Sequence, residues 1–121
     1  MTKTVLIVED NDLNLKLFED VLEAEGYGTL TAQSGLGAIE VARDERPDLI
    51  LMDIQLPEFS GLEATKRLKS DRTMSDIPVV AITAHALPGD EQRILEGGCA
   101  DYVAKPVALN ALVDTLKRHL N

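Results

Sequence analysis

The chain has 121 residues, enough for one domain with a single sizeable core, and we expect that domain to occupy residues 1–121. The composition is 45% hydrophobic and 27% charged, with neither a signal peptide nor a bilayer-spanning apolar run, which predicts a cytoplasmic protein without membrane insertion. The net charge of −9 disfavours binding to nucleic acid, and the single cysteine excludes an internal disulfide and a cysteine-based metal cluster.

Short apolar runs alternate with stretches of helical periodicity along the chain. In chain order, this pattern predicts a strand at 5–8, a helix at 13–22, a strand at 29–32, a helix at 36–42, a strand at 49–52, a helix at 62–68, a strand at 79–82, a helix between Pro88 and Gly97, a strand at 101–104 and a helix at 109–120. The runs at 5–8, 49–52 and 79–82 are continuously apolar, as in strands that are buried on both faces of a sheet.

Two of the helices differ in how firmly their sequences anchor them. Leu13, Leu17 and Val21 recur at helical spacing, and we expect all three to face the core. The helix between Pro88 and Gly97 has few apolar positions, so we expect it to be the element that shifts most easily.

Five strand–helix units with short connections predict an α/β fold with a doubly wound, five-stranded parallel sheet and helices on both faces. In open sheets of this type, ligands bind beyond the carboxyl ends of the strands. The residues that follow each predicted strand are therefore the candidates for function.

Charged and hydroxyl side chains follow four of the predicted strands. Glu9 and Asp10 follow the first strand, Asp53 the third, Thr83 the fourth and Lys105 the fifth. If the first and third strands are neighbours, the three carboxylates converge, and two carboxylates about 4 Å apart repel by roughly 4 kcal/mol at an effective dielectric constant of about 20. A divalent cation relieves this repulsion, and a ligand set made only of oxygens favours Mg²⁺.

Such a site is suited to phosphoryl transfer. A carboxylate can be the nucleophile and become an acyl phosphate, while the cation, Lys105 and the Thr83 hydroxyl hold the phosphoryl oxygens. Each residue alone has an ordinary interpretation, such as a helix-capping acid, a turn residue or a solvated lysine. Their gathering at one edge of one sheet favours a common function.

Several segments together form a more specific pattern: VEDN at 8–11, LMDIQLP at 51–57, glycine at 61, ITA at 82–84, GGCADY at 97–102 and KP at 105–106. Through them the whole chain resembles the receiver domain of two-component response regulators. That family implies a flavodoxin-like sheet with the strand order 2-1-3-4-5. Residues 3–11 and 83–86, and the lack of an output domain, are most similar to single-domain members that act in cell-division signalling.

The resemblance implies roles for the acidic residues and their neighbours. Asp53 is expected to accept the phosphoryl group, and Asp10 and Asp53 to bind Mg²⁺, or Mn²⁺ in its place, through carboxylate oxygens. Gln55 is implied as a ligand through its backbone carbonyl, and Glu9 as acting mainly through a metal-bound water. Gln55 and His85 are implied to border the phosphate and to tune how fast it is hydrolysed.

The resemblance also implies how the signal is held and transmitted. Lys105 is expected to contact the phosphoryl group, and its peptide bond to Pro106 is expected to be cis. Thr83 is implied as the switch hydroxyl and Tyr102 as the switch aromatic residue.

The family implies a signalling protein that catalyses only its own phosphorylation and dephosphorylation. Its donor would be a histidine kinase or a phosphotransfer protein, and protein partners would bind the face formed by the fourth helix, the fifth strand and the fifth helix. A phosphatase of the haloacid-dehalogenase type is an alternative, but it requires a second Asp where this chain has Gln55. A phosphorylation-independent binding module is the other alternative, and it would need neither Asp53 nor Lys105.

Overall fold

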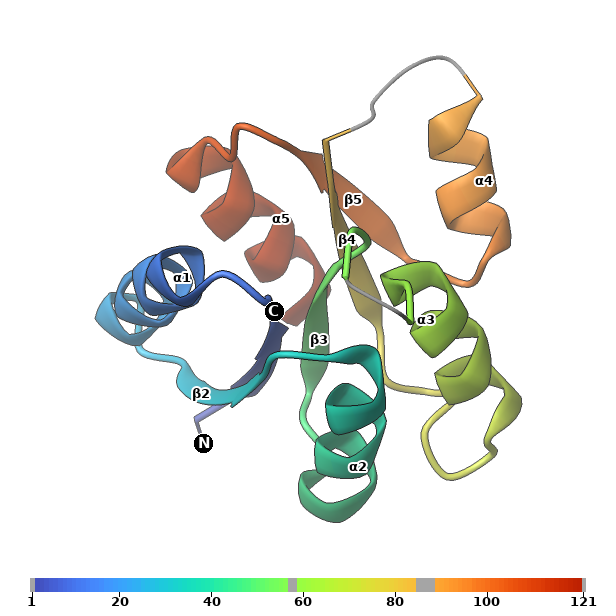
Figure 1. Cartoon of the computed structure of the whole chain (residues 1–121). Coiled ribbons are helices and arrows are strands. Elements are labelled where there is room, and N and C mark those ends of the chain that lie inside the picture. The colour runs from blue at the N-terminus through green and yellow to red at the C-terminus, as the bar shows by residue number, and fades with distance from the viewer. Residues whose placement is uncertain (1, 57–58, 85–88, 121) are drawn as a thin grey trace.

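A computed structural model of the chain describes residues 2–56, 59–84 and 89–120 (Figure 1). The elements, in order, are β1 (Thr4–Val8), α1 (Asp12–Ala24), β2 (Gly28–Ala32), α2 (Gly35–Glu45), β3 (Leu49–Asp53), α3 (Gly61–Ser70), β4 (Val79–Thr83), α4 (Asp90–Glu96), β5 (Asp101–Ala104) and α5 (Leu109–Leu120). All ten predicted elements are present, with bounds within a few residues of those expected. The predicted helix start at Pro88 lies outside the described residues.

The strands form one parallel sheet in the order β2-β1-β3-β4-β5. This order confirms the doubly wound fold and the topology that the family resemblance implied. β1 pairs directly with β3, with Val8 opposite Met52, so the residues that follow both strands meet at one edge of the sheet. The winding reverses between these two strands, which is where ligands bind in such sheets.

Helices cover both faces of the sheet (Figure 1). Because successive residues of a strand point to opposite faces, the sheet forms a separate hydrophobic core with the helices on each side. On one face α2, α3 and α4 cover a core that includes Leu6, Val8, Ile50, Met52, Ala38, Leu68 and Ile94. On the other face α1 and α5 cover a core that includes Val5, Ile7, Leu51, Ile82, Phe18, Leu22 and Leu116. Among the described residues, no helix is both long and apolar enough to cross a membrane.

Side-chain caps fix where three helices begin. Asn11, Ser34 and Ser60 each accept a hydrogen bond from a backbone N–H in the first turn of α1, α2 and α3, respectively. Asn11 therefore caps α1, which excludes the capping interpretation for Glu9 and Asp10. The two acids are left at the edge of the sheet for another function.

The expectation that Leu13 and Leu17 belong to the core is wrong. Their exposed fractions are 82% and 45%, whereas α1 contacts the sheet through the buried residues Phe18 and Leu22. Successive helical residues are about 100° apart, so Leu13 and Leu17 share a face that is rotated away from Phe18 and Leu22. The apolar residues of α1 thus cover two faces of the helix, and only one of them meets the sheet.

Helix α4 is anchored as weakly as its sequence predicts. It has seven residues, of which only Ile94 is buried, and its N-cap residue Gly89 provides no side-chain cap. Few buried apolar contacts are typical of segments that open or shift at low cost.

Candidate functional site

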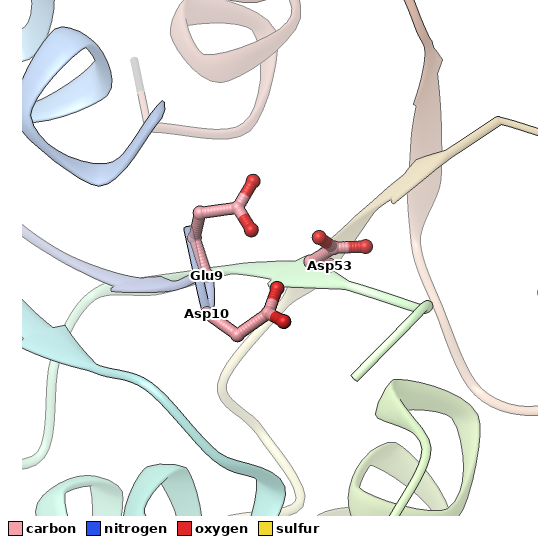
Figure 2. Close-up of side chains that lie close together, drawn as sticks. All are labelled: Glu9, Asp10 and Asp53. Carbon is pink, nitrogen blue, oxygen red and sulfur yellow. The ribbon is translucent and has the colours of Figure 1, made fainter. Parts of the chain in front are cut away.

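Three carboxylates converge where β1 and β3 end (Figure 2). Glu9 and Asp10 follow β1, Asp53 is the last residue of β3, and one oxygen of each lies within 4.8 Å of the others. Glu9 and Asp53 are each only 1% exposed, while Asp10 is exposed. The three carboxylates therefore form a group in which Glu9 and Asp53 are shielded from solvent and Asp10 is accessible to it.

Two donors hold the Asp53 carboxylate in place. The backbone N–H of Gln55 donates to Oδ1 at 2.9 Å, and the Lys105 ammonium donates to Oδ2 at 3.0 Å. The backbone N–H of Lys105 donates to the carbonyl of Thr83 at 2.8 Å, which ties the loop after β5 to the end of β4. The peptide bond between Lys105 and Pro106 is cis, as the family resemblance implied.

The buried carboxyl group of Glu9 is perturbed by its surroundings. Burial raises the pKa of Glu9 to about 7, and the neighbouring carboxylate of Asp53 adds to the increase. Its Oε2 accepts from the backbone N–H of Asn11 at 3.2 Å, whereas its Oε1 is buried without a hydrogen-bond partner among the described residues. A buried carboxylate oxygen in that position costs free energy unless a positive charge or a donor faces it.

These residues fit a small divalent cation. Among the described residues, the donors gathered here are oxygens only, and one of them is the unpartnered Oε1 of Glu9. The one ammonium that the described residues pair with this group, that of Lys105, leaves the three carboxylates incompletely neutralised. All-oxygen donor sets are typical of Mg²⁺, which keeps several waters and takes few carboxylates. Asp10 is the one carboxylate of the three that is exposed to solvent.

The predicted switch residues lie on β4 and β5. Thr83 is buried at the end of β4, and Tyr102 is half-buried on β5, opposite Ala81. The charge of Glu91 on α4 raises the pKa of the Tyr102 hydroxyl, and desolvation and a hydrogen bond to Glu91 add to the increase. Tyr102 therefore connects the edge strand to the weakly anchored helix α4. The tuning residue His85 lies outside the described residues.

Sequence reasoning missed how closely α3 packs against the end of β3, the strand that carries Asp53. Gly61 was recognised as part of the family pattern but was given no role. In the structure, its Cα lies directly against the backbone of Asp53 and Ile54. A glycine at the first position of a helix that follows a site residue is the sequence feature that indicates such close packing.

Comparison with known proteins agrees with this geometry. The family model for the response regulator receiver domain matches residues 5–117, and the chain belongs to this family. It is 57% identical to the polar-differentiation response regulator DivK of Brucella ovis, over 99% of this chain and 98% of the relative. The same protein of Brucella anthropi is 56% identical over the same shares.

Solved structures share the fold. The receiver domain of a sensor histidine kinase from Pseudomonas aeruginosa has a TM-score of 0.90 and 35% identity, over 99% of this chain and 98% of that one. That crystal structure has a magnesium ion coordinated in its active-site cleft. The chemotaxis protein CheY4 of Vibrio cholerae has a TM-score of 0.93 and 27% identity, over 99% of this chain and all of that one. The phosphatase alternative is not favoured by these matches.

Proposed function

We propose that the chain is a single-domain response regulator of cell-division signalling, in which Asp53 accepts a phosphoryl group from the phosphohistidine of a histidine kinase or a phosphotransfer protein. The observation that carries this proposal is the position of Asp53, buried at the switch point of the sheet between Lys105 and two further acids. The full-length match to DivK proteins supports the signalling role.

In the proposed transfer, a carboxylate oxygen of Asp53 forms a bond to phosphorus while the bond from phosphorus to the donor imidazole nitrogen breaks. The electron pair of the broken bond returns to that nitrogen. Gln55 N–H and Lys105 orient the carboxylate for this attack, since they already hold its two oxygens. Lys105 then remains beside the new acyl phosphate and offsets its negative charge.

The metal-binding residues in this proposal are Asp10 and Asp53 through their carboxylates, Gln55 through its backbone carbonyl, and Glu9 through a water. When bound, Mg²⁺ or Mn²⁺ supplies positive charge that neutralises the carboxylates and the phosphoryl oxygens. Within the part of the chain that the structure describes, the unpartnered Glu9 Oε1 and the all-oxygen donor set support this part of the proposal.

The proposed output is a change in protein–protein binding at the face made by α4, β5 and α5. Support comes from the weak anchoring of α4, from its exposed Leu95 and from the contact between Glu91 and Tyr102. Thr83 and Tyr102 are the proposed switch residues, and Gln55 and His85 border the phosphate and set its lifetime. We propose a cytoplasmic location and no binding to nucleic acid, which the net charge of −9 supports.

Mass spectrometry after incubation with acetyl phosphate and Mg²⁺ tests the proposal. We expect one phosphoryl adduct, located on Asp53, and none in the Asp53→Asn variant. Asp44→Asn is the matched control, because Asp44 is an exposed acid on α2, away from the site. Repeated turnover of phosphate esters would instead indicate a phosphatase, and an absent adduct would contradict the proposed function.

A further inference from the structure

Helix α3 begins against the backbone that carries the proposed phosphoacceptor. The N–H of Gly61, its first residue, donates to the carbonyl of Ile54 at 3.0 Å. The N–H of Ile54 in turn donates to the carbonyl of Ile82 on β4, also at 3.0 Å. The residue that follows Asp53 is therefore held by α3 on one side and by β4 on the other.

Gly61 makes this close packing possible. A Cβ atom at this position would lie 2.2 Å from the carbonyl oxygen of Asp53, 2.9 Å from its carbonyl carbon and 2.8 Å from the Cα of Ile54. All three are backbone atoms, so no side chain can rotate away to make room. The φ angle of Gly61 is not positive, unlike that of Gly26, so the position requires glycine for its missing side chain and not for an unusual backbone conformation.

The buried Thr65 holds the first turn of α3 in this position. Its hydroxyl donates to the carbonyl of Gly61 at 2.8 Å, and the thiol of Cys99 lies 4.0 Å from the same hydroxyl. Both backbone groups of Gly61, its N–H and its carbonyl, are thus hydrogen-bonded. They fix the position of the Cα between them, which packs against Asp53. Any added atom at Gly61 must move either α3 or the acceptor strand.

We propose that Gly61 is a positioning residue for Asp53, with Thr65 as its support. The bare Cα lets α3 rest on the Asp53 backbone, which fixes the Asp53 carboxylate relative to the Glu9–Asp10 pair and to Lys105. Functional sites tolerate displacements of only about 0.5 Å, and an added Cβ requires more than that. The inference rests on the proposed function only in its last step, since the packing of α3 on Asp53 is independent of any phosphoryl transfer.

The variant Gly61→Ala tests this proposal, with Gly37→Ala as the matched control. Gly37 also lies in the first turn of a helix, but a Cβ there meets only side-chain atoms, the Ser34 Oγ at 3.0 Å and the Ala32 Cβ at 3.8 Å. The first measurement is the amide NMR spectrum of the metal-free protein. We expect Gly61→Ala to move the signals of Asp53 to Gln55, and Gly37→Ala to leave them unchanged.

The second measurement is the affinity for Mn²⁺, followed by the Mg²⁺ concentration that gives half-maximal phosphorylation. We expect Gly61→Ala to weaken both by about tenfold or more, the range found when residues that orient metal ligands are changed. Gly37→Ala should stay within twofold of wild type. A variant that merely lost stability would bind metal normally in its folded fraction, which a melting curve identifies.

The outcomes separate the two proposals. Wild-type amide shifts and wild-type Mn²⁺ affinity in Gly61→Ala would overturn the positioning role. If the wild-type protein takes no phosphoryl group on Asp53 while the shifts and the Mn²⁺ affinity still change in the variant, the positioning role stands and the proposed function fails.

If Gly61→Ala does not fold, Thr65 provides the deciding variants. Thr65→Val keeps the shape of the side chain and removes the hydroxyl that holds the Gly61 carbonyl, so it should weaken Mn²⁺ binding severalfold. Thr65→Ser retains the hydroxyl and should restore the affinity. Normal Mn²⁺ affinity in Thr65→Val would then overturn the proposal.

Discussion

At the scale of single residues, the main feature of the site is that the carboxylates of Glu9 and Asp53 are buried with little positive charge beside them. Glu9 and Asp53 are removed from solvent, yet the described residues offer them one ammonium, that of Lys105. Burial of an acid is costly unless it is paired, and the raised pKa of Glu9 reflects this cost. The proposed cation would offset this cost, because it would supply the positive charge that the described residues lack at these acids.

The first prediction concerns which acid binds that cation directly. Asp10→Ala should weaken Mg²⁺ binding more than Glu9→Ala, because Asp10 is the proposed direct ligand and Glu9 is proposed to act through water. We expect a loss of about tenfold for Glu9→Ala, as for other residues one step removed from a metal, and a larger loss for Asp10→Ala. Calorimetric titration with Mg²⁺ gives both affinities.

The reverse order of these losses would assign direct ligation to Glu9. Full phosphorylation of Asp53 in the presence of excess EDTA would contradict the metal site as a whole. Asp44→Asn is the control here as well, because Asp44 is exposed near the end of α2, away from the three carboxylates.

Much of this site was predictable from the sequence. Glu9, Asp10, Asp53, Thr83 and Lys105 each follow an apolar run, and the alternation of strands and helices places such residues at one edge of a parallel sheet. The unpartnered oxygen of Glu9 and the contact of Gly61 with Asp53 were not predictable. Both depend on distances of a few ångströms between backbones that are remote in the sequence.

At the scale of single elements, the sequence predicted best the positions of the strands that are buried on both faces of the sheet. β1, β3 and β4 are almost wholly buried, so their apolar runs are unbroken and their positions are clear in the sequence. Helix α1 was predicted in its extent but not in its orientation. Its exposed Leu13 has the same periodicity as a core residue, and only the tertiary packing decides which face meets the sheet.

The exposed face of α1 gives the second prediction. Leu17, which shares this exposed face with Leu13, lines a pocket of about 190 Å³ together with Lys105 and Pro106, so the face adjoins the Asp53 site. Leu13→Asp should slow phosphoryl transfer from a phosphohistidine protein about tenfold, as expected when an apolar contact of 1–2 kcal/mol is lost from an interface. Transfer from acetyl phosphate should not change.

Rates with the two donors, measured side by side, check this prediction. Leu36→Asp is the matched control, because Leu36 is also an exposed leucine in the first turn of a helix, α2. Stability should change by less than about 0.5 kcal/mol in both variants, as for other surface substitutions. An equal loss of rate with both donors would show that Leu13 acts on the site itself rather than on a docked protein.

The third prediction concerns the contact between β5 and the end of α5. Asp101 Oδ2 lies 3.1 Å from both Arg118 Nη2 and His119 Nε2. Burial alone would raise the pKa of Asp101, but hydrogen bonds from the Tyr102 N–H, His119 and Arg118 outweigh it and hold the pKa below its ordinary value of 3.8. A lowered carboxyl pKa means that the folded state favours the charged form.

Asp101 therefore contributes stability above pH 3.8, and this contribution is lost as the pH falls through its lowered pKa in the folded state. Asp101→Asn should reduce the free energy of unfolding by about 1 kcal/mol near neutral pH, and the difference should shrink at more acidic pH. Urea unfolding between neutral and acidic pH measures both quantities. A difference that stays constant with pH would show that the charge of Asp101 is not the cause.

At the scale of the whole molecule, the sheet connects the edge that carries Glu9, Asp10 and Asp53 to the proposed output face. Thr83 ends β4 next to the site, and β4 pairs with β5, which carries Tyr102. Tyr102 contacts Glu91 of α4, the helix with a single buried residue. A change at the proposed phosphoacceptor Asp53 therefore has a short route, through the paired strands β4 and β5, to the weakly anchored helix α4.

The last prediction tests this route. Thr83 is proposed to move toward the phosphoryl group, and Tyr102 to change its burial as α4 shifts. Beryllofluoride mimics the acyl phosphate, so its addition with Mg²⁺ should move the amide NMR signals of Tyr102 and of 90–96 in the wild-type protein. In Thr83→Ala, the signals near Asp53 should still move, while those of Tyr102 and α4 should move much less.

The size of the response follows from the energetics of a two-state equilibrium. Preferential stabilisation of the phosphorylated conformation by about 1.4 kcal/mol shifts the populations tenfold, so a few contacts around Thr83 suffice. Thr29→Ala is the matched control, because Thr29 is a half-buried threonine on β2, at the opposite edge of the sheet from β5. If the shifts in the wild-type protein remain confined to the neighbours of Asp53, or if Thr83→Ala responds fully at α4, the signal does not pass through Thr83 and Tyr102.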